Sequence, residues 1–524
     1  MNSDNNHNVN NSPEIAYTKQ VSLEHRKKFA QFFTPVALAE LMAKWLLDSE
    51  TLQTVLEPAL GLGIFSRALL AKKNDVQIKG FEVDNIIFDQ AKKAFGENAN
   101  LLLEDYMYND WDNKYDGIIC NPPYFKFHDY DNKNILIEIE KQLKCKLNGF
   151  TNLYTLFLLK SIHQLKPNGR CAYIVPSEFL NSDYGRLVKQ HLLKTGMLRH
   201  IIVFNFEENV FDDALTTACI VLCANDHKTD KVQFTNIQSI NELHEIENTI
   251  QNYPKLSDHS KTFSFSELNP EIKWKAYYQQ QNGQNFKNLV PFSTYAKVVR
   301  GIATGANDYF TFNLAKAYKY KIDEKYLLPC ICHSVDVKGN HFTTSDFEEL
   351  RQQGKSVYLL NAVNSNDENV LNYLRQGEVE KIDKKFLTAS RNPWYSLEKR
   401  PTAPIWVSVF NRNGLRFVRN EAHISNLTTF HCIYPQTSIF FSEVSIDLLF
   451  AYLLTDTARH IFEDNAREYG NGLQKFEPND LNKGMMLDLR SLSINNKRKI
   501  EELYGKDTIY VDEIDNIFKE QFAN

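Results

Sequence analysis

Residues Val55–Phe65 read VLEPALGLGIF. The pattern predicts a short buried strand, a Gly-x-Gly turn and a helix, because the residues from Phe65 to Lys73 have helical spacing. Gly61 and Gly63 have no Cβ, so the backbone of the turn can approach a ligand closely. A Gly-x-Gly turn alone is a weak indication of a nucleotide site, and the strands that follow it strengthen the indication.

Three more strands follow, and each ends in a polar side chain. The strands are Val76–Val83, Ala99–Leu103 and Tyr115–Cys120, and the polar residues are Glu82, Asp105 and Asn121. Each acid alone is typical of a helix N-cap or a solvated loop. However, the Gly-x-Gly turn after the first strand and these three polar residues together mark the carboxyl ends of four successive strands. Open α/β sheets bind ligands at that edge. The alternation of strands and helices predicts an α/β fold, with a mostly parallel sheet covered by helices on both faces.

Residues Asn121–Tyr124 read NPPY and follow the buried strand directly. An exocyclic amino group of a nucleobase becomes a usable nucleophile when two acceptors hold its hydrogens. The side-chain oxygen of Asn121 and a backbone carbonyl can be those acceptors. Pro122 and Pro123 have a fixed φ and no N–H, so carbonyls of this turn can face inward. Tyr124 offers a flat face on which an extruded base can stack. The turn therefore indicates a reaction site.

The order of these motifs resembles that of the γ-class N6-adenine DNA methyltransferases of type II restriction-modification systems, the TaqI-like methylase family. The matching segments are QFFTP at Gln31–Pro35, then Glu57–Gly63, Glu82–Asp84, Asp105–Tyr106 and Asn121–Tyr124. The resemblance implies a Rossmann-like class I methyltransferase domain with a mostly parallel seven-stranded sheet. It also implies a C-terminal target-recognition domain of mixed α+β structure.

The resemblance further implies S-adenosyl-L-methionine as the methyl donor and a role for each matching residue. The methionine part of the donor is expected to contact Thr34, Glu57 and Ala59. Its ribose hydroxyls are expected to bind Glu82, and its adenine amino group is expected to bind Asp105. The donor site is completed by Gly61, Gly63, Tyr106 and Asn121. The catalytic residues are Asn121 and Pro122, which hold the target amino group, and Tyr124, which stacks on a flipped adenine. Phe211 adds a second contact to that base, although a phenylalanine before an apolar run is often a core residue.

These assignments divide the chain into three regions. We expect a disordered segment over residues 1–20, whose first eleven residues are rich in Asn. The methyltransferase domain is expected over residues 21–280 and the DNA target-recognition domain over residues 281–524.

The composition is that of a globular protein, with 43% hydrophobic and 24% charged residues in 524. No apolar run approaches the length of a membrane span, and Met1–Asn11 does not resemble a signal peptide. The eight cysteines form no paired framework, so we expect a bacterial cytoplasmic protein. Cys330-x-Cys332-His333 and Cys219-x3-Cys223 lack a second pair at suitable spacing, and we expect no metal site.

The net charge of -5 is unusual for a DNA-binding protein, but Lys381–Arg419 is locally basic. Its nine basic residues against two acidic ones give 9 - 2 = +7. Basic side chains neutralise phosphates. The residues that we predict to contact DNA are Lys384, Lys385, Arg391, Arg412, Arg416 and Arg419. An ordinary solvated face over a core would give the same pattern.

Several functions remain open at this point. The leading hypothesis is a sequence-specific adenine-N6 methyltransferase acting on double-stranded DNA as a monomer, with a cognate endonuclease acting independently. A methyltransferase of a protein glutamine or a guanine amino group would also use an NPPY turn. A non-enzymatic DNA-binding subunit and a modification subunit that needs a separate specificity chain are two further candidate functions. We do not expect a fused nuclease domain before Thr34.

Overall fold

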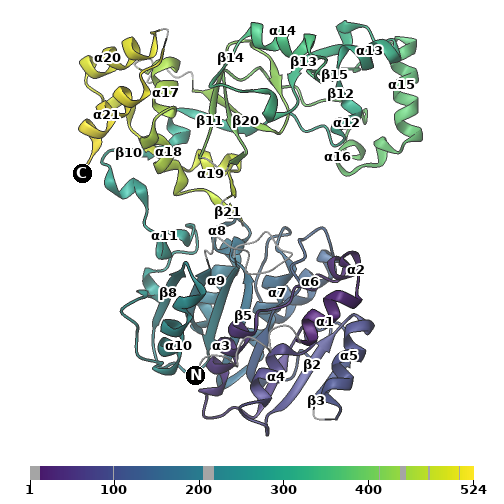
Figure 1. Ribbon diagram of the computed structural model, residues 1–524, viewed down its shortest axis with the longest axis vertical. Helices are drawn as coiled ribbons and strands as arrows, with labels where there is room; N and C mark the ends of the chain where they lie inside the picture. The colour runs from purple at the N-terminus through teal and green to yellow at the C-terminus, as the bar shows by residue number, and fades with distance from the viewer. Residues whose placement is uncertain are drawn as a thin grey trace. The chain divides into compact units, whose positions relative to one another are not determined.

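A computed structural model describes residues 12–97, 99–204, 218–411, 414–436, 444–469, 473–506 and 508–524. The chain divides into two compact units (Figure 1). The first contains the described residues up to Gln280, and the second contains those of Gln281–Arg467 and Leu473–Asn524. No described helix is both long enough and apolar enough to cross a membrane.

A single nine-stranded sheet forms the centre of the first unit. Its strands are β1 (Thr54–Glu57), β2 (Gln77–Glu82), β3 (Ala99–Leu103), β4 (Tyr115–Cys120), β5 (Leu165–Pro176), β6 (Leu198–Phe204), β7 (Ala218–Ala224), β8 (Lys231–Ile237) and β9 (Lys261–Ser264). They lie in the order β3-β2-β1-β4-β5-β7-β6-β8-β9. The first five are mutually parallel, and β7 runs antiparallel to both β5 and β6.

The expectation of seven strands was therefore wrong in number. Strands β1–β7 occupy the first seven places in the sheet, and β8 and β9 add two more strands beyond β6. The reason is that β6 is buried along its whole length and needs a neighbour on its outer side. Val232 and Phe234 of β8 are buried, and Phe234 packs against the rings of Trp274 and Tyr277.

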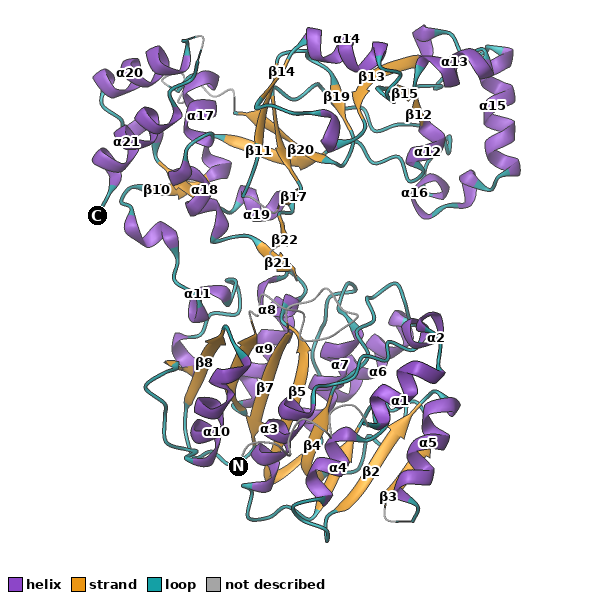
Figure 2. Cartoon of the chain, viewed as in Figure 1, coloured by secondary structure: helices purple, strands orange, loops and turns teal. Residues whose placement is uncertain are grey.

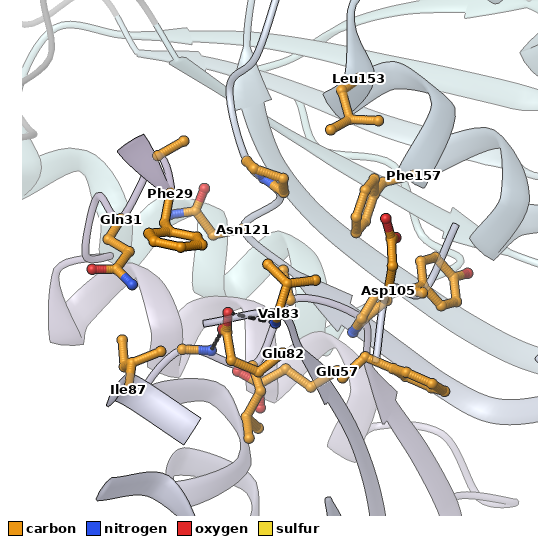
Figure 3. A pocket seen from close by; sticks show the side chains of 18 of the residues that line it. Phe29, Gln31, Glu57, Glu82, Val83, Ile87, Asp105, Asn121, Leu153 and Phe157 are labelled. Atoms are coloured by element: carbon orange, nitrogen blue, oxygen red, sulfur yellow. Dashed lines mark hydrogen bonds between the residues drawn. The ribbon is translucent and has the colours of Figure 1, made fainter. Parts of the chain in front are cut away.

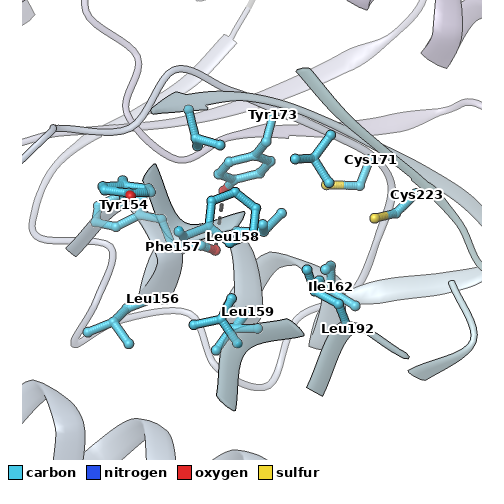
Figure 4. Close-up of a cluster of buried hydrophobic side chains, with 14 of the residues drawn as sticks. Tyr154, Leu156, Phe157, Leu158, Leu159, Ile162, Cys171, Tyr173, Leu192 and Cys223 are labelled. Carbon is cyan, nitrogen blue, oxygen red and sulfur yellow. Dashed lines mark hydrogen bonds between the residues drawn. The ribbon is translucent and has the colours of Figure 1, made fainter. Parts of the chain in front are cut away.

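Helices cover both faces of this sheet (Figure 2). They are α3 (Val36–Leu47), α4 (Ile64–Leu70) and α10 (Leu243–Gln251) on one face, and α6 (Asn132–Leu143), α7 (Leu153–His163) and α9 (Gly185–Thr195) on the other. Helix α5 (Asn85–Phe95) packs beside β2 and β3. Side chains of α7 and α9, such as Leu159 and Leu192, pack against Cys171 and Tyr173 of β5 (Figure 4). This core holds β4 and β5 rigidly behind the turn at Asn121.

We expected disorder over residues 1–20; residues 1–11 lie outside the described residues, and residues 13–20 form a helix. Helix α1 spans Pro13–Gln20, because Ser12 caps its first turn and Pro13 occupies a favourable first position. Tyr17 is fully buried and packs with Leu62 and Ile87. Short helices α2 (Leu23–Lys28), α8 (Glu178–Asn181) and α11 (Lys275–Tyr278) complete the unit.

The second unit combines short sheets with peripheral helices. Five strands, β11 (Ala296–Arg300), β20 (Phe430–Pro435), β16 (Ile405–Ser408), β18 (Phe417–Asn420) and β14 (His341–Phe342), form its largest sheet in that order. A four-stranded sheet contains β12 (Thr311–Phe312), β15 (Tyr358–Leu360), β13 (Leu327–Ile331) and β19 (Ser425–Asn426) in that order. A two-stranded sheet pairs β10 (Leu289–Pro291) with β23 (Met485–Leu487). A three-stranded sheet contains β17 (Phe410–Asn411), β22 (Leu473–Lys475) and β21 (Arg467–Tyr469). The helices are α12 (Asn307–Phe310), α13 (Leu314–Tyr320), α14 (Thr344–Gln352), α15 (Glu368–Val379), α16 (Phe386–Ala389), α17 (Ile446–Leu453), α18 (Asp456–Glu463), α19 (Pro478–Asn482), α20 (Ile494–Tyr504) and α21 (Val511–Phe522).

Candidate active site

A cavity of about 280 Å³ lies at the carboxyl ends of β1, β2 and β4 (Figure 3). Its lining contains most of the residues that we assigned to the donor site: Thr34, Glu57, Ala59, Gly61, Glu82, Asp105, Tyr106 and Asn121. Gly63, Pro122 and Tyr124 are not among the lining residues, although Pro123 is. The structure therefore brings side chains from separate segments of the sequence to one cavity.

Glu57 ends β1 and is fully buried. One of its carboxylate oxygens, Oε2, accepts hydrogen bonds from the backbone N–H of Ser66, at 3.0 Å, and from the Ser66 hydroxyl. The other oxygen, Oε1, is buried and has no hydrogen-bond partner among the described residues. Burial raises the pKa of Glu57 to about 8, against the lowering effect of the Ser66 hydrogen bonds. A buried acceptor of this kind suits a cationic ligand group, which would restore the charged form.

The two glycines of the turn serve different purposes. Both adopt a left-handed backbone, with φ of 56° at Gly61 and 72° at Gly63. Gly61 lines the cavity and its N–H donates to Oε2 of Glu82, 2.9 Å away. A Cβ on Gly63 would lie 2.4 Å from the ring of Phe95. Gly63 thus allows α4 to pack closely against α5, and its assignment to the donor site stays a prediction.

Glu82 ends β2 with its carboxylate fixed by the backbone. Oε1 accepts from the N–H groups of Val83 and Asp84 at 2.8 and 3.0 Å, and Oε2 accepts from Gly61. Burial raises its pKa, and these three hydrogen bonds oppose the rise. Since an ionised carboxylate has about four acceptor positions, one position on Oε2 remains for a hydroxyl.

Asp105 and Tyr106 follow β3 in a tight turn. The Asp105 carboxylate accepts from the N–H of Met107 at 2.8 Å, and its pKa is raised by burial. The ring of Tyr106 is almost fully buried and tilts against Phe81 and Phe157, with one side contributing to the cavity lining. The turn therefore offers an acceptor beside an apolar wall.

Asn121 is oriented by the segment before α3. Its side-chain nitrogen Nδ2 donates to the carbonyl of Phe32 at 2.9 Å and to Oγ1 of Thr34 at 3.0 Å. A carbonyl can only accept, so the nitrogen must face Phe32 and the oxygen Oδ1 must face the opposite way. Thr34 and Phe32 therefore leave Asn121 with a fixed acceptor.

Tyr124 is half-buried and Pro122 is buried. The ring of Tyr124 stacks with Phe32, with 6.2 Å between the ring centroids and 15° between the planes, and meets Tyr154 edge to face. Its hydroxyl donates to the carbonyl of Ile174 at 3.4 Å. Phe211, which we expected to provide a second ring, lies outside the described residues.

The sequence reasoning missed the attachment of the N-terminal segment to Asp84. The Asp84 carboxylate bonds with His25 at 2.8 Å and accepts from Gln31 at 2.6 Å and from the Tyr17 hydroxyl at 3.4 Å. Burial alone would raise the pKa of Asp84, but the hydrogen bonds from His25 and Gln31 outweigh it and lower the pKa. Glu14, another lining residue, pairs with Arg67 of α4. The sequence signal that could have indicated this attachment was a second acid, Asp84, two positions after Glu82.

The basic residues expected to contact DNA have different surroundings in the second unit. The side chains of Lys384 and Lys385 are exposed beside an exposed Phe386. Arg391 donates hydrogen bonds to the carbonyls of Ala303 and Thr304. Arg416 donates to the carbonyls of Ser334 and Val337. Arg419 donates to the carbonyl of Pro404 and to the Asp447 carboxylate. Arg412 lies outside the described residues. The three described arginines thus hold loops of their own unit.

The first unit is an α/β fold with a cavity lined by acids and an amide at the carboxyl ends of its strands. Residues 37–211 match the Eco57I restriction-modification methylase family, and residues 275–520 match the C-terminal domain of type II methyltransferase M.Eco57I. The chain is 69% identical to type II methyltransferase M.AccI of Acinetobacter calcoaceticus, over 95% of this chain and 92% of that protein. It is 25% identical to type II methyltransferase M.HincII of Haemophilus influenzae, over 77% and 74% of the two chains. The chain belongs to the DNA methyltransferases of type II restriction-modification systems.

Solved structures show the same fold at low sequence identity. The type IIL restriction-modification enzyme MmeI, solved in complex with DNA, gives a TM-score of 0.57 at 13% identity, over 97% of this chain and 78% of that one. The DrdV chain of a DrdV–DNA complex gives a TM-score of 0.50 at 11% identity, over 86% and 55%.

Proposed function

We propose that this protein is a γ-class enzyme that transfers a methyl group from S-adenosyl-L-methionine to the N6 amino group of an adenine flipped out of double-stranded DNA. The carrying observation is the orientation of Asn121, whose nitrogen is held by Phe32 and Thr34 so that Oδ1 is free to accept. Asn121 also lines the cavity that contains Glu57, Glu82 and Asp105. An acceptor for an amino group therefore lies beside a cavity suited to a nucleoside with a cationic tail.

The residues of the cavity fit the methyl donor. The buried, unpartnered oxygen of Glu57 suits the ammonium of its methionine part, near Thr34 and Ala59. The remaining acceptor position of Glu82 suits a ribose hydroxyl, and the Asp105 carboxylate suits the adenine amino group beside the Tyr106 ring. When bound, S-adenosylmethionine supplies an electrophilic methyl group on a positively charged sulfur.

On the target side, the chain positions the nucleophile. Oδ1 of Asn121 and the carbonyl of Pro122 would accept the two hydrogens of the amino group, which turns the nitrogen lone pair out of conjugation and toward the methyl group. As the N–C bond forms, the S–C bond breaks to leave S-adenosylhomocysteine, and the methylated nitrogen gives one proton to the solvent. The ring of Tyr124 stacks on the flipped base, which contributes about 1–3 kcal/mol against the loss of pairing and stacking in the duplex. Positioning and fixed dipoles account for the rate acceleration in this scheme.

We further propose that the second unit binds the duplex and reads its sequence, with Lys384 and Lys385 on phosphates. The enzyme is proposed to act as a monomer in the bacterial cytoplasm, one strand at a time. It would thereby protect host DNA from an independent endonuclease with the same target site.

The experiment is a methylation assay with radiolabelled S-adenosylmethionine and plasmid DNA, followed by digestion to nucleosides. We expect the label in N6-methyladenine, and sequencing of the modified sites gives the recognition sequence. Label in N4-methylcytosine, in a guanine derivative or only in protein would contradict the proposal.

A further inference from the structure

Lys160 is a fully buried lysine on α7 that has no role in the proposed chemistry. Its ammonium donates to the carbonyls of Tyr106 and Asn109. The same nitrogen lies 4.0 Å from the centre of the Tyr106 ring and 4.3 Å from that of Trp111. All these contacts belong to the turn after β3 or to the residues next to it.

That turn carries Asp105, the acid at one end of the cavity. It is closed by short-range hydrogen bonds, from the N–H of Met107 to the Asp105 carboxylate at 2.8 Å and from the Asn109 side chain to the Asp105 carbonyl at 2.9 Å. It begins two residues after β3, which lies at the edge of the sheet and pairs only with β2 among the described strands. Part of its external support comes from Lys160 and from Gln164, the residue that caps the end of α7, which donates to the carbonyl of Asn113 and accepts from the Tyr106 hydroxyl. Lys79 of β2 and Tyr115 of β4 also support the turn, because both donate to the Asp110 carboxylate.

Burying a lysine is costly unless its charge is satisfied. Burial lowers the pKa of Lys160 to about 7, and the charges of Asp110, Asp105 and Glu138 oppose that shift. The effect is reciprocal, since the charge of Lys160 counteracts the burial that raises the pKa of Asp105. Lys160 thus does two things for Asp105: it fixes the backbone of its turn, and it favours the ionised carboxylate, which accepts a hydrogen bond better than the acid.

We infer that Lys160 is a positioning residue that holds the Asp105 turn in the geometry that recognises the adenine amino group of the methyl donor. The inference rests on the proposed function, because it assumes that the cavity binds S-adenosylmethionine with its adenine at Asp105. It predicts that Lys160 contributes to base selectivity at the donor site and not only to folding.

The test compares S-adenosylhomocysteine with S-inosylhomocysteine, whose base has a carbonyl oxygen in place of the amino group. Dissociation constants are measured by calorimetry at pH 7 for the full-length wild type, Lys160→Met and Lys160→Gln. The wild type should bind the adenosyl compound far better, because an ionised Asp105 accepts from an amino group and repels a carbonyl. We expect Lys160→Met to weaken adenosyl binding about tenfold or more and to reduce the ratio of the two affinities. Lys160→Gln keeps two N–H donors, so its adenosyl affinity and its affinity ratio should fall less. This variant replaces Lys160→Met in the test if the methionine variant does not fold.

The matched control is Lys189→Met. Lys189 is also buried, has a pKa lowered by burial to about 7 and donates to two carbonyls, those of Leu180 at 3.0 Å and Ile272 at 2.6 Å. None of these residues lines the cavity. We expect this control to lower the melting temperature and to leave the affinity ratio at the wild-type value.

The outcomes separate the inference from the proposed function. A wild type that binds neither compound would contradict the proposed donor. A wild type that prefers the adenosyl compound, together with an unchanged ratio in a folded Lys160 variant, would overturn the inference and leave the proposed function standing. An equal fall of the ratio in Lys189→Met would also overturn it, because general loosening of the fold would then be the cause.

Discussion

At the scale of single residues, the site consists of acceptors whose free positions are set by their neighbours. Asn121 has one free oxygen because Phe32 and Thr34 occupy its nitrogen. Glu57 has one free oxygen because Ser66 occupies the other. In both cases a main-chain group or a hydroxyl fixes half of the polar group and leaves the other half for a ligand.

Replacing Asn121 with Ala should lower the rate of methyl transfer far more than the affinity for the donor. The acceptor for the target amino group is lost, and removal of one such preorganised group costs about 10²–10³ in rate. Thr34→Val should have a smaller effect, since Phe32 still holds the amide. Single-turnover transfer to DNA and calorimetry with S-adenosylhomocysteine measure the two steps. Normal transfer by Asn121→Ala would refute the assigned role.

Glu57 should make donor binding release protons. Its pKa is about 8 in the folded protein and 4.5 ordinarily, so at pH 7 much of it is protonated before binding. An ammonium beside it stabilises the carboxylate and expels that proton. Calorimetry of S-adenosylhomocysteine in buffers of different ionisation enthalpy should show this release at pH 7, and Glu57→Gln should lose it. Equal proton release by both proteins would assign the effect to another group.

The same shift has a consequence for stability. A raised pKa means that between pH 4.5 and about 8 the unfolded chain has given up a proton that folded Glu57 retains. The contribution of Glu57 to folding stability therefore falls as the pH rises through this window. Glu57→Gln should remove this component from the pH dependence of the unfolding free energy.

At the scale of elements, the strand ends are positioned by how closely their helices approach. The turn after β1 needs Gly63, because α5 presents Phe95 to it. The N-terminal segment is attached to the end of β2 through Asp84 and to α4 through the Glu14–Arg67 pair. Glu14 and residues 29–34 of this segment line the cavity.

Gly63→Ala should destabilise the first unit. The left-handed backbone costs a non-glycine residue about 1 kcal/mol, and the new methyl group would overlap the Phe95 ring. We expect a total loss of about 2–4 kcal/mol in unfolding free energy, measured by denaturant titration. The double variant with Phe95→Leu should recover the part due to overlap. No recovery would show that backbone strain alone is responsible.

At the scale of the whole molecule, the two compact units have separate tasks in the proposed function. The first contains the cavity and the Asn121 turn, and the second contains the exposed lysines beside Phe386. The net charge of -5 does not oppose this division, because phosphate contact depends on local charge.

Replacing Lys384 and Lys385 together with Ala should weaken DNA binding without lowering the melting temperature. Each phosphate contact contributes about 0.9 to the slope of log affinity against log salt, so the magnitude of the slope should fall by about 2. Arg416→Ala is the contrasting variant, because its guanidinium bonds to Ser334 and Val337 and its loss should lower the melting temperature. An unchanged salt slope in the double lysine variant would show that these lysines do not contact phosphate.

The sequence by itself determined where β1, β2, β3 and β4 lie along the chain, the acid or amide at or just after the end of each, and the position of the Asn121 turn. It could do so because buried strands are apolar runs of limited length. The expected strands Ala99–Leu103 and Tyr115–Cys120 agree with β3 and β4. Local pattern also indicated a methyltransferase of a type II restriction-modification system, since a motif order is a property of the linear chain.

Only the tertiary structure decided which polar atoms remain available. The partner of Asn121 at Phe32 is 89 residues away, and those of Arg391 at Thr304 and Arg416 at Val337 are 87 and 79 residues away. Hydrogen bonds between such distant residues depend on how elements pack, and no local pattern encodes them. For this reason the sequence did not show that Gly63 packs against Phe95 or that the three described arginines bond within their own unit, and their predicted ligand and DNA contacts stay predictions.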